Sequence, residues 1–163
     1  MQRDNQYTFK SRVRFSEVDH TKRITLPGIV NYFQDCSTFQ SEGLGLGLGV
    51  DHFAKHKRAW ILSAWQVVID RYPSLGEEIS VSTWATEFNG LYGLRNFCME
   101  DEGQQMTACA NSVWVYMDIE KGRPQSREKT RRRHTEKGSL SRWSMRPGRS
   151  RFQRMQSLWM HFR

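Results

Sequence analysis

The sequence lacks the features by which secreted and membrane-spanning proteins are most easily recognised. It has three cysteines, none of them in a Cys-x-x-Cys pair, and its first ten residues are polar rather than an apolar secretory leader. No apolar run approaches the roughly 20 residues that a membrane-spanning helix needs. We therefore expect a cytoplasmic protein with buried, reduced thiols and no membrane partner.

Two short motifs lack the residues that would give them chemistry. The run 44–49 alternates Leu and Gly, but it follows a helical pattern and has no Gly-Lys-Ser or Gly-Lys-Thr ending for a phosphate. His52 and His56 have the spacing of a zinc-protease motif, but Phe53 stands where that motif needs Glu. We expect 44–49 to be a turning connection and the two histidines to lie on a solvated helix face. We expect neither a metal nor another cofactor.

Positive charge is concentrated at one end of the chain. The 163 residues carry a net charge of +8, but residues 125–163 contain twelve Lys and Arg against two Asp and Glu. Residues 1–124 are slightly acidic, which argues against nucleic acid as a partner of the globular part. Binding of nucleic acid or an acidic carrier protein by the basic tail stays open on charge alone.

The segment 125–163 also differs in pattern. It contains no Val or Ile, and a run of three arginines, 131–133, begins a stretch in which apolar residues show no sustained period. Such a stretch cannot bury enough apolar surface to fold by itself. We expect one domain over 1–124 and an irregular, disordered tail, with a short amphipathic helix over 152–162 as the only element in it.

The clearest element is a helix over 26–43. One face carries apolar residues at helical spacing, namely Ile29, Tyr32, Phe33, Cys36 and Phe39. Thr25 is placed to cap the helix, Pro27 is tolerated in its first turn, and Gly43 offers a left-handed stop. The polar residues fall mostly on the other side, namely Asn31, Gln34, Asp35, Ser37 and Gln40.

The rest of the chain reads as strands. Residues 7–15 alternate in polarity as a half-buried strand does, and 60–69 is apolar on both faces, which is typical of a central, covered strand. Further strands follow over 77–87, 91–100 and 105–118, with a hairpin turn at Asn89-Gly90. We expect an α+β fold in which an antiparallel sheet of about five strands wraps around one long helix.

This order of elements resembles the hotdog fold, and its motifs resemble the N-terminal half of the acyl-acyl-carrier-protein (acyl-ACP) thioesterases. The resemblance covers residues 7–124. The matching residues occur in the family's order: Arg14, Ser16, Glu17, Val18, Asp19; Asn31, Tyr32, Phe33, Gln34; 60–70; Pro73, Gly76, Glu77; Ser82, Thr83, Trp84; Arg95; Ala108, Ala110, Ser112, Trp114, Val115, Met117, Asp118; and Gly122, Arg123, Pro124.

The resemblance implies a hydrolase that releases free fatty acid from acyl-ACP in fatty acid biosynthesis. Family members are double hotdogs, whose N-terminal hotdog shapes the acyl-chain cavity and whose C-terminal hotdog carries a catalytic Asn-x-His motif. This chain has no such motif, since His134 and His161 lack the Asn. The simplest hypothesis is that a frameshift or truncation after Pro124 replaced the second hotdog.

Asp19 is the candidate catalytic residue if one hotdog acts alone. It matches the carboxylate of single-hotdog acyl-CoA thioesterases of the 4-hydroxybenzoyl-CoA type, in which the helix N-terminus can polarise the carbonyl. Backbone N–H groups near residues 27–29 would then lie at the helix start. The alternative is that Asp19 caps backbone groups or pairs with Arg23. Glu17 is a weaker candidate.

Candidate substrate-binding residues come from the helix and two strands: Asn31, Tyr32, Phe33, Trp65 and Arg95. The plainer alternative is that the aromatic residues are core and that the stem of Arg95 packs on the sheet. Cys36 is expected to be a core thiol. A further alternative is an inactive acyl-binding hotdog. In each case we expect an acyl-ACP or coenzyme A thioester ligand and a homodimer, because a single hotdog leaves a sheet edge uncovered.

Overall fold

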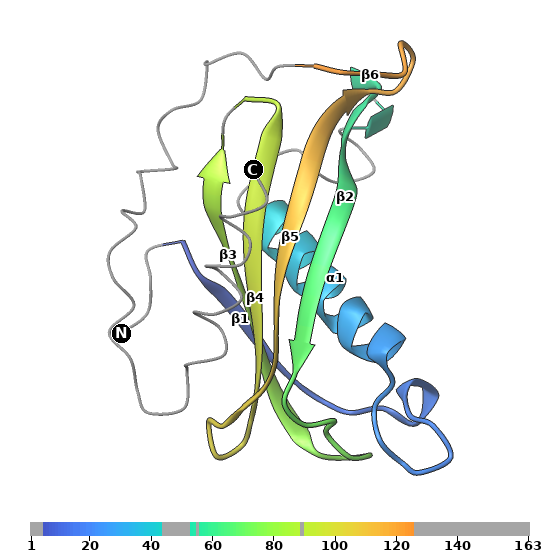
Figure 1. Ribbon diagram of the computed structural model, residues 1–163, viewed down its shortest axis with the longest axis vertical. Helices are drawn as coiled ribbons and strands as arrows, with labels where there is room; N and C mark the ends of the chain where they lie inside the picture. Colours follow the sequence, from blue (N-terminus) through green and yellow to red (C-terminus); the bar gives the residue numbers. More distant parts are fainter. Residues whose placement is uncertain (1–4, 44–52, 55, 89, 126–163) are drawn as a thin grey trace.

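The computed structural model describes residues 5–43, 53–54, 56–88 and 90–125, and one long helix lies against one face of a curved antiparallel sheet (Figure 1). The elements in chain order are β1 (Tyr7–Arg12), a 3-10 turn η1 (Phe15–Glu17), α1 (Leu26–Gly43), β2 (Arg58–Ile69), β3 (Glu78–Phe88), β4 (Tyr92–Asp101), β5 (Met106–Asp118) and β6 (Arg123–Pro124). The predicted α+β hotdog fold is confirmed. The predictions for 44–49, His52 and 126–163 lie outside the described residues.

The sheet order is β1-β3-β4-β5-β2, with the two-residue β6 added to β5. The prediction that the strand over 60–69 is central is wrong, because β2 pairs with β5 alone in the described part of the chain. The two faces of β2 are apolar for different reasons. Trp65, Val67 and Ile69 pack on the core under α1, whereas Val68 packs with Cys109 on the opposite face.

A register shift in β2 changes which residues share a face. The pairing with β5 is irregular between Leu62 and Ala64, as in a β-bulge. Trp60 and Leu62 lie opposite Tyr116 and Trp114, while Trp65 lies opposite Ser112. The bulge therefore brings Trp60 and Leu62 onto the same face as Trp65, although strict alternation places them on the other one.

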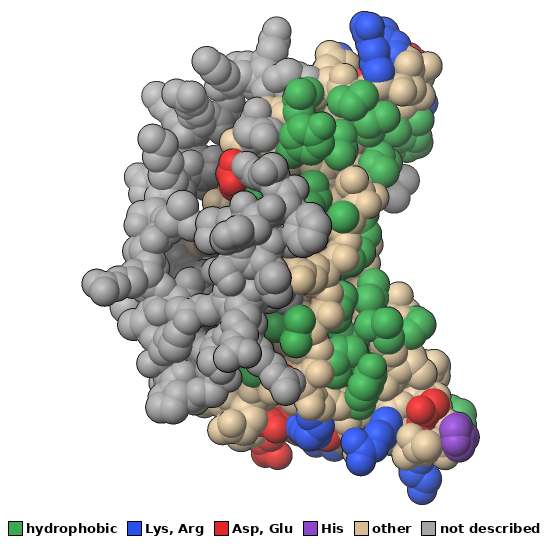
Figure 2. Space-filling model, viewed as in Figure 1, with side chains coloured by type: hydrophobic (Ala, Val, Ile, Leu, Met, Phe, Trp, Pro, Cys, Tyr) green, Lys and Arg blue, Asp and Glu red, His purple; other side chains and the backbone are tan. Residues whose placement is uncertain are grey.

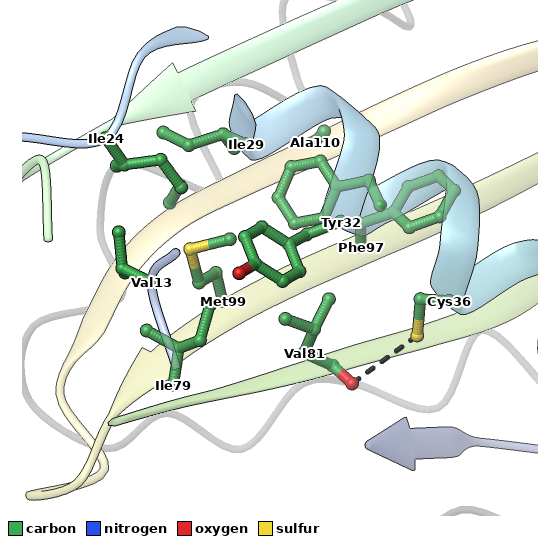
Figure 3. Packing of buried hydrophobic residues seen from close by; sticks show 12 residues of the cluster. Val13, Ile24, Ile29, Tyr32, Cys36, Ile79, Val81, Phe97, Met99 and Ala110 are labelled. Atoms are coloured by element: carbon green, nitrogen blue, oxygen red, sulfur yellow. Dashed lines mark hydrogen bonds between the residues drawn. The ribbon is translucent and has the colours of Figure 1, made fainter. Parts of the chain in front are cut away.

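The core lies between α1 and the concave face of the sheet. The helix contributes the predicted stripe of Ile29, Tyr32, Phe33 and Cys36, all at most 1% exposed, and Figure 3 shows it against side chains of β3, β4 and β5. Phe39 departs from the prediction, because it is 45% exposed and touches only the edge of the sheet through Phe9.

The start of α1 is fixed by a compact cap. The hydroxyl of Thr25 accepts a hydrogen bond from the Gly28 N–H at 3.1 Å, which confirms the predicted N-cap. The N–H and hydroxyl of Thr25 both donate to the Glu17 carbonyl, at 2.9 and 3.2 Å. Gly28 lets this carbonyl approach, since a Cβ there would lie 3.1 Å from the oxygen. Gly43 ends the helix without a positive φ, so the predicted left-handed stop is wrong.

One ion-pair network closes the end of the sheet near the turns. The guanidinium of Arg71, just after β2, donates to Glu77 ahead of β3 and to Asp101 at the end of β4, with 2.8 Å between Arg71 Nη2 and Asp101 Oδ2. The hydrogen bond from Arg71 is the main reason that the pKa of Glu77 lies below its usual value of 4.5. The network therefore ties three strand ends together through one side chain.

We expect Arg71→Met to lower the free energy of unfolding by about 1 kcal/mol at pH 7, because the pair is partly exposed and screened. Because the pKa of Glu77 is lower in the folded than in the unfolded chain, Glu77 stabilises the fold fully when the pH is above its unfolded-state pKa. This stabilisation is lost as the pH falls through the folded-state pKa. The deficit should therefore shrink as the pH falls below 4.5. Urea unfolding followed by tryptophan fluorescence measures it, and Arg12→Met, in an exposed pair with Glu78, is the matched control. A deficit of equal size at pH 3 and pH 7 would contradict this account.

Candidate functional site

The predicted site residues fall into two regions at opposite halves of α1. Asp19 lies beside the first turn of the helix, whereas Phe33 lies near its middle and packs on Trp65, and Arg95 contacts Gln40 in its second half. Asn31 is exposed on the solvent side of α1 and joins neither group.

Asp19 lies in an open pocket of about 300 Å³ at the helix start, lined by Asp19, Arg23, Ile24, Thr25, Leu26 and Tyr72. The sequence therefore placed Asp19 next to the helix correctly. Its Oδ1 accepts hydrogen bonds from the N–H of Thr21 at 2.8 Å, from the Thr21 hydroxyl at 2.6 Å and from the N–H of Arg23 at 3.3 Å. The Thr21 hydroxyl bond is the largest cause of its lowered pKa. This geometry is that of an ionised carboxylate holding its own loop.

The helix N–H groups expected to polarise a carbonyl are already used. The N–H of Gly28 is bound to the Thr25 hydroxyl and that of Ile29 to the Thr25 carbonyl at 3.0 Å, while Pro27 has no N–H. The cap therefore satisfies the N–H groups of Gly28 and Ile29, and a catalytic role for the helix start stays a prediction. Glu17 is nearly buried and accepts from Arg14 Nη2 at 2.7 Å, which is a structural role.

Three aromatic rings meet under the middle of α1, and we call Phe33, Trp65 and Phe97 the aromatic cluster. Their ring centroids lie 4.9 Å apart for Trp65–Phe97, 5.2 Å for Phe33–Phe97 and 6.1 Å for Phe33–Trp65. Phe33 and Phe97 are fully buried, while Trp65 is partly exposed. Tyr32 points elsewhere, since its hydroxyl donates to the Arg12 carbonyl at 2.7 Å.

Arg95 lies beside the aromatic cluster. Ser112 lies directly opposite it on β5, and Trp65 lies opposite Ser112 on β2, so the three share one row of the concave face. Arg95 Nη1 donates to Gln40 Oε1 and, at 3.2 Å, to the Thr83 hydroxyl. Burial lowers the pKa of Arg95 to about 10, so the guanidinium is still positive at neutral pH.

Gln40 is the site residue that the sequence analysis missed. It was placed on the solvent side, yet it is 6% exposed, and its amide donates to the Asn5 carbonyl at 2.6 Å while its oxygen accepts from Arg95. Gln40 follows Cys36 by four residues and Phe33 by seven, which is helical spacing and places it on the buried stripe. This spacing was the sequence feature that indicates its burial.

Cys36 is confirmed as a core thiol. It is fully buried, its Sγ donates to the Val81 carbonyl at 3.4 Å (Figure 3), and burial raises its pKa to about 12. Such a thiol is protonated at neutral pH and is a poor nucleophile.

Comparison with known proteins identifies the family of this chain. The family model of the acyl-ACP thioesterase N-terminal domain matches residues 4–131. The chain belongs to the acyl-ACP thioesterase family. Relatives include the acyl-ACP hydrolase FATB3 of Cuphea viscosissima, 29% identical over 112 residues, and the palmitoyl-acyl carrier protein thioesterase of Gossypium hirsutum, 28% identical. Each alignment covers 65% of this chain and 27% of the relative, so the chain spans about a quarter of their length.

Solved thioesterase structures share the fold. A structure described as an oleoyl thioesterase of Lactobacillus plantarum superposes with a TM-score of 0.71 at 25% identity, over 75% of this chain and 47% of that one. The 12:0-ACP thioesterase of Umbellularia californica gives a TM-score of 0.67 at 19% identity, over 75% and 46%. In the part of the chain that the structure describes, no helix is long and apolar enough to cross a membrane.

We expect thiol reagents to leave Cys36 and Cys109 unmodified in the folded protein at pH 8, because burial raises both pKa values to about 12. Mass spectrometry after reaction with 5,5′-dithiobis(2-nitrobenzoate) identifies the modified residue, and the same reaction in urea, which should modify all three cysteines, is the control. Rapid modification of Cys36 under native conditions would contradict its assignment as a core thiol.

Proposed function

We propose that this chain is the acyl-binding hotdog of an enzyme that hydrolyses fatty acyl-ACP to free fatty acid and carrier protein, which ends chain growth in fatty acid biosynthesis. The family match over nearly all of the described residues carries the proposal. The aromatic cluster supports it, because the partly exposed ring of Trp65, backed by the buried rings of Phe33 and Phe97, is an apolar surface suited to an acyl chain. Among the predicted substrate-binding residues, Trp65 would meet the chain, Phe33 would support it from behind, and Arg95 would lie at its polar end.

Thioester hydrolysis needs a positioned nucleophile and donors for the oxyanion. At the start of α1, Oδ1 of Asp19 accepts the hydrogen bonds of its own loop, and the N–H groups of Gly28 and Ile29 are bound within the cap. No Asn-x-His motif occurs in the 163 residues. We therefore assign acyl binding to this hotdog and hydrolysis to a second, catalytic hotdog.

A single-hotdog acyl-CoA thioesterase that uses Asp19 is the second candidate. The pocket beside Asp19 and the helix start favours it, since a thioester carbonyl brought there would lie near a carboxylate. A Staphylococcus aureus protein whose structure contains CoA has the same fold, with a TM-score of 0.69 at 12% identity. A cytoplasmic location stays a prediction under either function, and the plant relatives above are described as chloroplastic.

We expect the chain alone to bind palmitoyl-ACP without hydrolysing it, and we expect Asp19→Asn to leave the background rate of hydrolysis unchanged. The substitution keeps an oxygen that can accept the loop hydrogen bonds but removes the charge. Release of free thiol from palmitoyl-ACP and palmitoyl-CoA measures the rate, and gel-shift titration measures binding. A turnover that Asp19→Asn lowers tenfold or more would establish the single-hotdog enzyme instead.

We further infer that two copies of the chain pair edge to edge through β2. In the described sheet, β2 uses only one of its edges, and an unpaired edge is a template for another strand. Ile61 on this strand is 44% exposed, and Figure 2 shows apolar side chains gathered over the β5–β2 side of the sheet. A closed two-fold pair would cover the free edge of β2 in each copy.

We expect Ile61→Lys to raise the dissociation constant of the homodimer at least tenfold, because a charge on an edge strand opposes pairing. Sedimentation velocity over a range of concentrations measures it. Phe15→Lys is the control, since this residue is 83% exposed on η1, away from β2. A wild-type chain that sediments as a monomer at all concentrations would rule out the pairing.

A further inference from the structure

We propose that Arg95 receives the carboxylate of a free long-chain fatty acid whose alkyl chain lies against the aromatic cluster. The class of ligand follows from the proposed function, because a free fatty acid is the product of acyl-ACP hydrolysis. It adds a recognition site for the product's carboxylate.

The first observation is that the charge of Arg95 is uncompensated. Both of its hydrogen-bond acceptors are neutral, namely the Gln40 amide oxygen and the Thr83 hydroxyl. None of the ion pairs formed by the described residues includes Arg95. Removing a charge from water without a counter-ion is costly, and a bound anion relieves that cost.

The second observation is that donors around Arg95 are still available. Its two hydrogen bonds are both made by Nη1, so within the described residues Nε and Nη2 have no acceptor. These two N–H groups form the side of the guanidinium fork that binds a carboxylate through both oxygens. The indole N–H of Trp65, two strands away in the same row, is buried and also has no acceptor.

The surroundings favour a carboxylate on an alkyl chain over a small inorganic anion. Phe97 is two residues from Arg95 on β4 and therefore lies on the same face of the sheet. Its ring contacts Trp65 and Phe33, so the apolar surface begins next to the guanidinium. Arg95 and Trp65 are both only partly buried, whereas Phe33 and Phe97 are fully buried, so a ligand would meet the aromatic cluster through Trp65.

Gln40 provides a direct test, because replacing its amide by a carboxylate would fill the proposed site from within. In Gln40→Glu the new carboxylate would occupy the position of Gln40 Oε1 and pair with Arg95. Arg95→Met removes the charge and keeps an apolar stem. Gln34→Glu introduces the same change on α1 at a partly exposed position where no hydrogen bond to Arg95 is made, and it is the matched control.

The experiment compares the binding of dodecanoate and dodecanol to the full chain by isothermal titration calorimetry. We expect the wild type and Gln34→Glu to bind dodecanoate at least tenfold more tightly than dodecanol. Gln40→Glu and Arg95→Met should lose this preference and still bind dodecanol. If Arg95→Met fails to fold by circular dichroism, Gln40→Glu decides, because it keeps the Arg95 side chain and gives it an ion pair.

Equal affinity of the wild type for dodecanoate and dodecanol would overturn the proposal, as would a carboxylate preference that survives in Gln40→Glu. Neither result depends on catalysis. A chain that never contributes to acyl-ACP hydrolysis can still show the preference, and loss of the preference leaves the hydrolysis assay unaffected. Failure of the proposed function and failure of the Arg95 site are therefore distinguishable.

Discussion

The interior of this hotdog depends on how the first turn of α1 is held. Thr25 binds the Glu17 carbonyl through its N–H and hydroxyl, and the same hydroxyl accepts from the N–H of Gly28. This cap fixes where the helix begins relative to the sheet. Each turn thereafter meets a particular strand residue, so that Cys36 reaches Val81 and Gln40 reaches Arg95.

The helix divides the interior into an apolar half and a half with polar groups. Near its start, Ile24 and Ile29 belong to one buried hydrophobic cluster with Met99 (Figure 3). Near its end, Gln40 and Arg95 bring an amide and a charge next to the aromatic rings. A fatty acid has the same two-part character, which is why the second half of α1 suits an amphiphile better than a purely apolar ligand.

Local patterns in the sequence predicted the helix well and its surroundings less well. The bounds 26–43 and the cap at Thr25 follow from residues close in sequence, and both were confirmed. The edge position of β2 and its bulge depend on pairing with β5, about 50 residues away, and alternation alone cannot show either. The burial of Gln40 likewise depends on Asn5 and Arg95, which are 35 and 55 residues distant.

Gly28 shows how the close contact at the helix start limits substitution. In most helices Ala in place of Gly is stabilising by about 1 kcal/mol, because glycine loses more backbone entropy on folding. Here the added methyl would lie 3.0 Å from Ile24 Cγ1 and 3.1 Å from the Glu17 oxygen. That oxygen cannot retreat without breaking both hydrogen bonds from Thr25. Ala at position 28 would thus displace the start of α1 although it improves helix propensity. Directed evolution for stability should therefore retain Gly28.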